Sequence, residues 1–256
     1  FSKRQKLRNN AFMQFSSICY FYCLVLSNSL SVHMNKLFHL GNHKKTVALR
    51  MTSQLSQKNH HRFRFVDIGA NLLDERFTEG SYRGKKRHEP DFDDVLRRAS
   101  DGGMLHLILT AGTLAESKLA IERVRELRRL NQTDCELYCT VGVHPTRCME
   151  FENSEVGKTA DEHAQALLDI TKDGIRDGVV VAVGELGLDY DRLQFCPKDV
   201  QRENFVRQLL TLPSETGLPL FLHNRNVGEE LLELLVEHRE KWENAGGVVH
   251  SFDDSA

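Results

Sequence analysis

Apolar runs alternate with amphipathic segments along the chain from Phe63 onward. The runs are short and rich in valine, isoleucine and leucine, which is typical of strands buried on both faces of a parallel sheet. The segments between them carry apolar residues on one helical face. The predicted strands are 65–69, 105–110, 137–143, 179–183, 218–222 and 246–250, and the predicted helices are 91–100, 114–130, 160–177, 198–215 and 227–242. This alternation predicts an α/β fold with a parallel sheet.

The strands have similar lengths and polar C-terminal ends, which favours a TIM-type (β/α)8 barrel over an open sheet. Such a barrel needs about 250 residues, whereas residues 63–256 supply 194. The chain ends six residues after His250, in the last predicted strand. We therefore expect an incomplete, C-terminally truncated barrel with about six βα units.

Charge divides the chain into two parts. No Asp or Glu precedes Asp67, and residues 1–66 carry eleven Lys and Arg, which leaves 23 basic and 36 acidic residues in the remainder. Such asymmetry indicates different roles for the two parts. We interpret residues 1–62 as a basic leader that is disordered, targeting or untranslated, and residues 63–256 as the partial barrel domain.

The leader contains one apolar run, Ile18–Leu26, of about nine residues. A bilayer span needs about 20, so no membrane span is predicted. We expect a cytoplasmic protein, with a nuclear location and organellar or secretory targeting by residues 1–50 as open alternatives.

The acidic remainder lacks the basic face that duplex binding by charge alone requires. Nucleic-acid contacts there are expected to be local, at a metal and a few arginines. The chain has six cysteines and no CxxC pair. We expect reduced thiols, with Cys135 and Cys139 packing in a strand rather than binding metal.

Metal-compatible side chains follow three consecutive predicted strands: Glu185, His223 and His250. In parallel barrels the C-terminal strand ends meet at one mouth, where ligands and metals bind. Imidazole and carboxylate are ligands for divalent cations. Either histidine alone would be interpreted as a hydrogen-bonded core residue, but the three together predict a metal site.

Four further polar residues lie near the same predicted mouth. Arg225 and Arg192 are candidates for binding substrate phosphate, with solvated loop charges or partners for a nearby Asp as the alternative. Asn71 closes the first strand and is a candidate for the same role, or for an Asx turn. Asp189 either orients an adjacent metal ligand or caps the following loop.

Six segments carry a family resemblance, in order along the chain: FVDIGANLLDERF (65–77), YRGKKRHEPD (82–91), TVGVHPTRC (140–148), VGELGLDYDRLQFCPKDVQ (183–201), LPLFLHNRN (218–226) and VVHSFD (248–253). They closely resemble the TatD family of metal-dependent deoxyribonucleases. The resemblance implies a TIM barrel and DNA phosphodiester hydrolysis, often 3′→5′ on single-stranded DNA, with Mg²⁺ or alternatively Zn²⁺ or Mn²⁺. It also implies that Glu185, His223 and His250 are metal ligands.

The chain departs from that family at several places, and two of these concern metal ligands. Many relatives carry an H-x-H pair where this sequence has Gly69 and Asn71, which implies fewer or weaker metals. A further family ligand is an aspartate on strand eight, a strand that would follow residue 256.

The sequence thus predicts a divalent ion that polarises a phosphoryl oxygen and activates water. Glu185 would orient that water, and Arg225 and Arg192 would stabilise charge on the phosphoryl oxygens. Two alternatives stay open: an inactive truncated fragment, and an amidohydrolase-type hydrolase of a small amide or ester. The metal count and oligomeric state are not predicted.

Overall fold

The computed structural model describes residues 64–153 and 159–253. The predictions for residues 1–62, including a leader or targeting segment, lie outside the described residues. Among those that are described, no helix combines the length and apolarity needed to cross a membrane.

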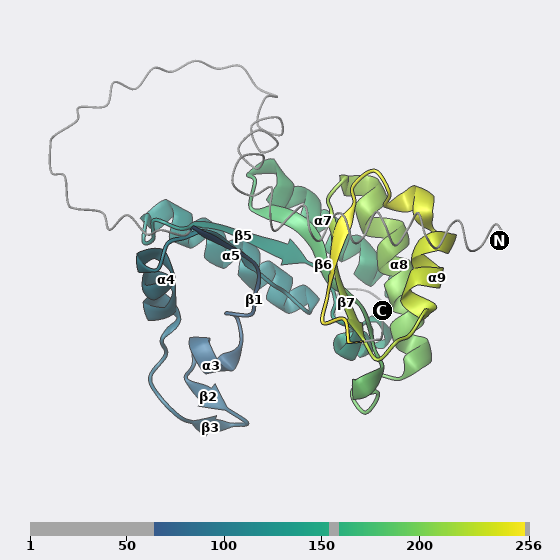
Figure 1. Cartoon of the computed structure of the whole chain (residues 1–256), viewed down its shortest axis with the longest axis horizontal. Coiled ribbons are helices and arrows are strands. Elements are labelled where there is room, and N and C mark those ends of the chain that lie inside the picture. Colours follow the sequence, from purple (N-terminus) through teal and green to yellow (C-terminus); the bar gives the residue numbers. More distant parts are fainter. Residues whose placement is uncertain (1–63, 154–158, 254–256) are drawn as a thin grey trace, which may run out of the picture. The chain divides into compact units, whose positions relative to one another are not determined.

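One parallel sheet organises the described chain (Figure 1). Its six strands lie in the order β1-β4-β5-β6-β7-β8, so each strand pairs with the next long strand along the chain. Their bounds are β1 Phe65–Ala70, β4 Met104–Leu109, β5 Glu136–Val141, β6 Val180–Asp189, β7 Leu220–Arg225 and β8 Gly247–His250. The predicted α/β class with six βα-type strands is confirmed.

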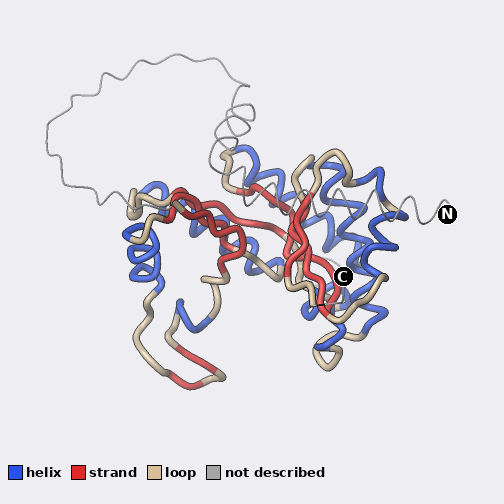
Figure 2. The backbone as a smooth tube through the Cα atoms, viewed as in Figure 1, coloured by secondary structure: helices blue, strands red, loops and turns tan. Residues whose placement is uncertain are grey.

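Five longer helices connect these strands and border the bent sheet (Figure 2). They are α4 Phe92–Asp101, α5 Leu114–Leu130, α7 Ala160–Arg176, α8 Lys198–Thr216 and α9 Glu230–Glu237. Helices α5 and α7 begin where a side chain accepts a hydrogen bond from a first-turn backbone amide that has no partner within the helix. The Thr113 hydroxyl accepts from the Glu116 amide of α5, and Thr159 and Glu162 form a capping box on α7.

Shorter elements occupy the connections. They are α3 Glu75–Thr78, the hairpin strands β2 Ser81–Tyr82 and β3 Lys85–Lys86, the 3₁₀ turns η1 Pro145–Arg147, η2 Tyr190–Arg192 and η3 Arg239–Lys241, and α6 Met149–Glu152. The pattern of apolar residues did not predict them, because each is too short to show a period.

The core lies between the helices and the sheet. Val124 and Leu127 of α5, and Phe205 and Leu209 of α8, are almost fully buried. Strand β6 is buried or half-buried along its whole length, as expected for a central parallel strand. Cys135 and Cys139 are buried free thiols.

The sheet is strongly curled. A Cβ atom built on Gly69 of β1 would lie 2.9 Å from the Phe221 ring of β7, four positions away in the strand order. In a flat sheet, two strands four positions apart would be about 19 Å from each other, because neighbouring strands are about 4.8 Å apart. The curl therefore brings the C-terminal ends of distant strands toward one another.

Two predicted elements, β6 and α9, differ most from their observed bounds. Strand β6 does not end at Val183, because its parallel pairing with β7 resumes after an irregularity at Gly184-Glu185 and continues to Asp189. Helix α9 begins at Glu230 rather than Val227, since Asn226 and Gly228 have left-handed backbones with φ of 50° and 65°. Its other end is shortened as well, where the Trp242 indole donates to the Leu235 carbonyl.

Candidate metal centre

Glu185 lies on β6, at the irregularity that interrupts the pairing with β7. Beyond it, Gly187 pairs with His223 in register. Gly187 has φ +146°, and a Cβ atom there would lie 2.1 Å from the His223 carbonyl oxygen. Only glycine therefore permits this close approach of β6 to β7, which brings the Glu185 and His223 side chains together.

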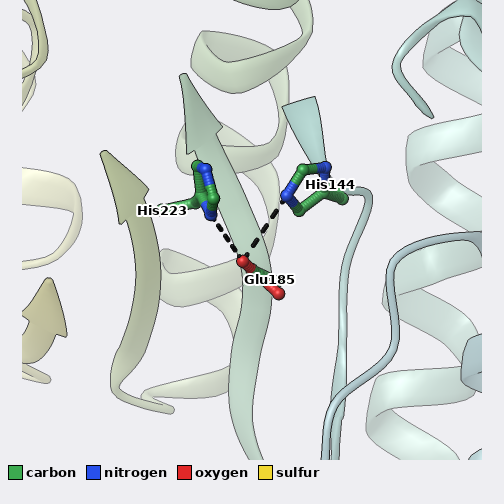
Figure 3. Close-up of side chains that lie close together, drawn as sticks. All are labelled: His144, Glu185 and His223. Atoms are coloured by element: carbon green, nitrogen blue, oxygen red, sulfur yellow. Dashed lines mark hydrogen bonds and ion pairs between the residues drawn. The ribbon is translucent and has the colours of Figure 1, made fainter. Parts of the chain in front are cut away.

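Three imidazoles surround one carboxylate oxygen, Oε1 of Glu185. His223 Nδ1 lies 2.7 Å from it, His250 Nε2 lies 2.7 Å from it, and His144 Nε2 lies 3.5 Å from it. Figure 3 shows the Glu185 carboxylate between the His144 and His223 rings, which approach it from either side. These four side chains come from β6, β7, β8 and the turn after β5, so neighbouring strand ends supply the whole cluster.

Asp189 holds the second ring nitrogen of His223. Its Oδ2 lies 3.2 Å from His223 Nε2, and the carboxylate is fully buried. The side chain makes no capping hydrogen bond to η2. Of the two roles considered from the sequence, the geometry matches orientation of His223 rather than a loop cap.

Ring packing fixes the imidazoles further. The His223 ring lies edge-on to His144 at 4.6 Å between centroids and to His250 at 5.2 Å. Phe221 stacks on His250 at 4.5 Å with an interplanar angle of 3°. The same Phe221 ring occupies the space that a side chain at position 69 would need. The absence of a histidine at Gly69 is thus matched by an aromatic ring that fills its place.

The protonation states suit a cation site. Burial lowers the pKa of His144 to about 4, against the weaker opposing effect of the Glu185 charge. Burial of Glu185 opposes its ionisation, but the ring nitrogens of His223 and His250 outweigh that effect and hold the Glu185 pKa well below its ordinary value. At neutral pH the cluster therefore offers a carboxylate and a neutral imidazole, the forms in which these groups bind metals.

The donor set fits a divalent ion. One ligand atom from each of His144, Glu185 and His223 lies within 4.8 Å of the others. His250 Nε2 is buried and approaches Glu185 without an aligned hydrogen bond to any described residue. Convergent, partly unsatisfied nitrogens around one carboxylate are the arrangement expected where a cation binds.

The predicted phosphate-binding residues separate into two groups. Arg225 pairs with Asp189 in register at the end of β7, and Arg192 lies in η2, 3.7 Å from the Asp189 carboxylate. Both therefore lie beside the cluster. Asn71 is exposed at the end of β1 and makes no hydrogen bond to the cluster among the described residues. Its proposed contact with substrate phosphate stays a prediction.

His144 is the member that the sequence analysis missed. It follows β5 by three residues, at the same edge of the sheet as Glu185, His223 and His250. The Nδ1 atom of His144 accepts a hydrogen bond from the Thr146 amide, which orients the ring. The His144 amide donates to the Gly112 carbonyl, which holds the backbone of the same residue. The signal that could have found it is its position after a strand end, directly before Pro145.

Comparison with known proteins decides the family. Residues 66–256 match the model of the family described as TatD related DNase. The chain belongs to the TatD family. The sequence is 36% identical over 193 residues to "Deoxyribonuclease Tat-D" of Schizosaccharomyces pombe, covering 75% of this chain and 58% of that protein. It is 32% identical over 186 residues to "3'-5' ssDNA/RNA exonuclease TatD" of Shigella flexneri serotype 5b, covering 73% and 58%.

Solved structures agree with this assignment. A hydrolase of the TatD family from Entamoeba histolytica matches with a TM-score of 0.64 and 38% identity, over 75% of this chain and 59% of that one. An uncharacterized amidohydrolase from Saccharomyces cerevisiae matches with a TM-score of 0.60 and 30% identity, over 67% and 51%. The TIM-type class predicted from the sequence is confirmed. The chain spans 58% of the length of these two curated TatD relatives.

Proposed function

We propose that this chain carries the metal centre of a deoxyribonuclease that hydrolyses phosphodiester bonds of single-stranded DNA from the 3′ end. The observation that carries the proposal is the convergence of three imidazole nitrogens on Oε1 of Glu185. The names of the matched relatives, a deoxyribonuclease and a 3′-5′ ssDNA/RNA exonuclease, favour a nucleic acid over a small amide or ester as substrate.

The cation is proposed to be Mg²⁺, with Mn²⁺ or Zn²⁺ as substitutes, held by Glu185, His223 and His250, with His144 beside them. A bound divalent ion supplies Lewis-acid polarisation of a phosphoryl oxygen and a water of lowered pKa. A relative from Bacillus subtilis, 26% identical over 182 residues, is named an uncharacterized metal-dependent hydrolase. That name supports a metal but not its identity.

The chain's own residues supply position and charge. Asp189 fixes the His223 ring, so that Nδ1 faces Glu185. The Glu185 carboxylate is ionised and is placed to orient a water near the cluster by accepting its hydrogen bond. Arg192 and Arg225 lie at the ends of neighbouring elements beside Asp189. Their guanidinium groups are suited to bind the equatorial oxygens of a phosphate and stabilise charge there.

Hydrolysis of labelled oligonucleotides tests the proposal. The 256-residue chain is incubated with single-stranded DNA labelled at either end, with MgCl₂ or with EDTA. We expect nucleotides to be released from the 3′ end with Mg²⁺ only. His223→Ala His250→Ala should lose this activity by at least about 100-fold, because both rings contact the Glu185 carboxylate oxygen.

The matched control is His238→Ala, since His238 caps the far end of α9, outside the cluster. Hydrolysis that survives EDTA, or that survives in the double variant, would contradict the proposal. Metal-dependent cleavage of a small amide with none of DNA would support the amidohydrolase alternative instead.

A further inference from the structure

A strongly basic hairpin follows β1 and was not predicted as an element. Strands β2 and β3 join through a two-residue turn, and the segment 81–88 reads SYRGKKRH. It contains Arg83, Lys85, Lys86 and Arg87 and no acidic residue. The chain beyond residue 66 has 23 basic and 36 acidic residues, so this basic hairpin (residues 81–88) opposes the charge of its surroundings.

The backbone of the basic hairpin is tightly held. Gly80 accepts two amide hydrogen bonds, from Arg87 at 2.7 Å and from His88 at 3.1 Å. A Cβ atom on Gly80 would lie 2.0 Å from the His88 carbonyl, so glycine is required there. The Arg83 amide donates to the Glu75 carboxylate at 3.1 Å, which ties the turn to α3. The hairpin is therefore a preorganised support for its side chains.

The turn places an arginine where other residues are preferred. Arg83 and Gly84 have φ of 52° and 70°, the pattern of a type I′ turn, whose first position favours Asn, Asp or Gly. An arginine in this left-handed position costs conformational energy, and such residues gather at functional sites. Its guanidinium lies 5.3 Å from the centroid of the half-exposed Tyr82 ring, which directs it outward beside an aromatic face.

Three of the four cations lack a counterion in the part of the chain that the structure describes. Arg83, Lys85 and Arg87 are exposed and form no ion pair with any described residue, whereas Lys86 contacts Glu89 and the Glu79 carbonyl. Elsewhere arginines are often paired, as Arg125 is with Asp173 and Asp177. Three unpaired cations within five residues carry a local positive charge that suits a polyanion better than one carboxylate.

The basic hairpin extends from the same edge of the sheet as the metal centre. It begins after the C-terminal end of β1, and α3, β2 and β3 continue beyond that end (Figure 1). Strand β1 is three positions from β6, which carries Glu185. At about 4.8 Å per strand, the ends of β1 and β6 are about 14 Å apart along the sheet edge.

We propose that the basic hairpin binds the phosphate backbone of a single-stranded nucleic acid whose end lies at the metal centre. Arg83, Lys85 and Arg87 contact successive phosphates, and the Tyr82 ring offers a face for a base. This inference rests on the proposed function, because it extends the substrate path from the same site. The hairpin contributes affinity that depends on strand length but not on sequence.

Salt dependence of binding tests it. Fluorescence anisotropy with a labelled oligothymidylate is measured in EDTA, between about 50 and 200 mM NaCl, for the 256-residue chain and for Lys85→Gln Arg87→Gln. Each lost phosphate contact should reduce the slope of log K against log salt by about 0.7, so the double variant should lose about 1.4. Arg83→Asn, which suits the left-handed turn, should lose about 0.7 without unfolding the hairpin.

The matched control is Lys118→Gln Arg129→Gln, which removes one lysine and one arginine from the exposed face of α5. Because residues 1–62 are also basic, only differences between variants are interpreted. An unchanged slope in both hairpin variants, or an equal loss in the control, overturns the inference. If the unsubstituted chain hydrolyses DNA with Mg²⁺ but the hairpin variants keep the same slope, the proposed role of the hairpin is refuted and the proposed function is not. A reduced slope with no hydrolysis would refute the proposed function alone.

Discussion

The buried carboxylate of Asp189 contacts His223, a residue of the candidate metal centre. It has one oxygen 3.2 Å from His223 Nε2, while its other oxygen has no hydrogen-bond partner among the described residues. A carboxylate in this position selects the ring tautomer and raises the basicity of the nitrogen that faces the metal. The contact therefore fixes the orientation in which the His223 ring directs Nδ1 toward Glu185.

Replacing Asp189 should weaken metal binding more than it weakens the fold. We expect Asp189→Asn to lower the affinity for Mn²⁺ by about 10–100-fold, as found for partners of metal-binding histidines. Isothermal titration calorimetry measures the affinity, with chemical denaturation as a check on stability. Asp191→Asn is the control, because Asp191 is exposed and contacts Asn226 instead of His223. Equal affinities in the Asp189 variant and the control would refute this role.

His144 should make the fold sensitive to mild acid. The unfolded chain binds a proton at His144 below pH 6.5, whereas the folded chain does so only near pH 4. Protonation therefore favours the unfolded chain, and the free energy of unfolding falls as the pH drops through this window. We expect the His144 contribution to decrease by about 2 kcal/mol between pH 7 and pH 5.

The comparison variant is His144→Asn, whose side chain can still accept from the Thr146 amide. Urea denaturation in EDTA at pH 7 and pH 5 should show a smaller loss of stability than in the unsubstituted chain. The lowered pKa of Glu185 has its effect below 4.5, its ordinary value, so it does not enter this range. Parallel losses in the two proteins would show that His144 does not titrate in this window.

Among the elements, α8 supports the site from behind through two buried glutamines one heptad apart. Gln208 accepts from the Val143 amide at 2.8 Å and donates to the Val143 carbonyl at 3.2 Å, directly before His144. Gln201 accepts from the Asp189 amide at 2.8 Å and donates to its carbonyl at 2.9 Å. Each amide side chain thus pairs with both the amide and the carbonyl of one residue at the end of a strand or just beyond it.

Truncating either glutamine should destabilise the fold and disturb the metal centre. Gln208→Ala leaves the Val143 amide and carbonyl unpaired in the core, which should cost about 1–3 kcal/mol in the free energy of unfolding. The control Gln165→Ala removes an exposed glutamine on α7 and should change stability by less than about 0.5 kcal/mol. Denaturant midpoints for the two variants measure the difference. A Gln208 variant as stable as the control would show that water replaces the lost hydrogen bonds.

Over the whole molecule, the strand and helix order followed from the sequence because each long element has a clear period. Helix α5 was predicted with its observed bounds, since Thr113 caps its start and Asn131 ends it with a left-handed backbone. Glu185, His223 and His250 were predicted as neighbours because parallel strands share one C-terminal edge. His144 directly follows the predicted strand 137–143, but it was missed because only the ends of the three later strands were considered as ligand positions. The Phe221 ring behind the site was missed because curl is not encoded in periodicity.

Metal binding should stabilise the whole described domain. An ion that binds only the folded chain adds about 2.7 kcal/mol at a concentration 100 times its dissociation constant. For a domain of this size the unfolding midpoint should rise by about 5–10 °C. Thermal scans with MnCl₂ and with EDTA measure this shift, which His223→Ala His250→Ala should abolish. The same shift in that variant would place the ion elsewhere.

The contact between Gly69 and the Phe221 ring also constrains how this protein can diverge. Any larger residue at position 69 collides with the ring, and shrinking the ring alone leaves a void beneath His250. A descendant that acquired a metal-binding histidine on β1 would have to change both positions, and either first step would lower its stability. We therefore expect a histidine at position 69 to be tolerated only together with a smaller residue at position 221.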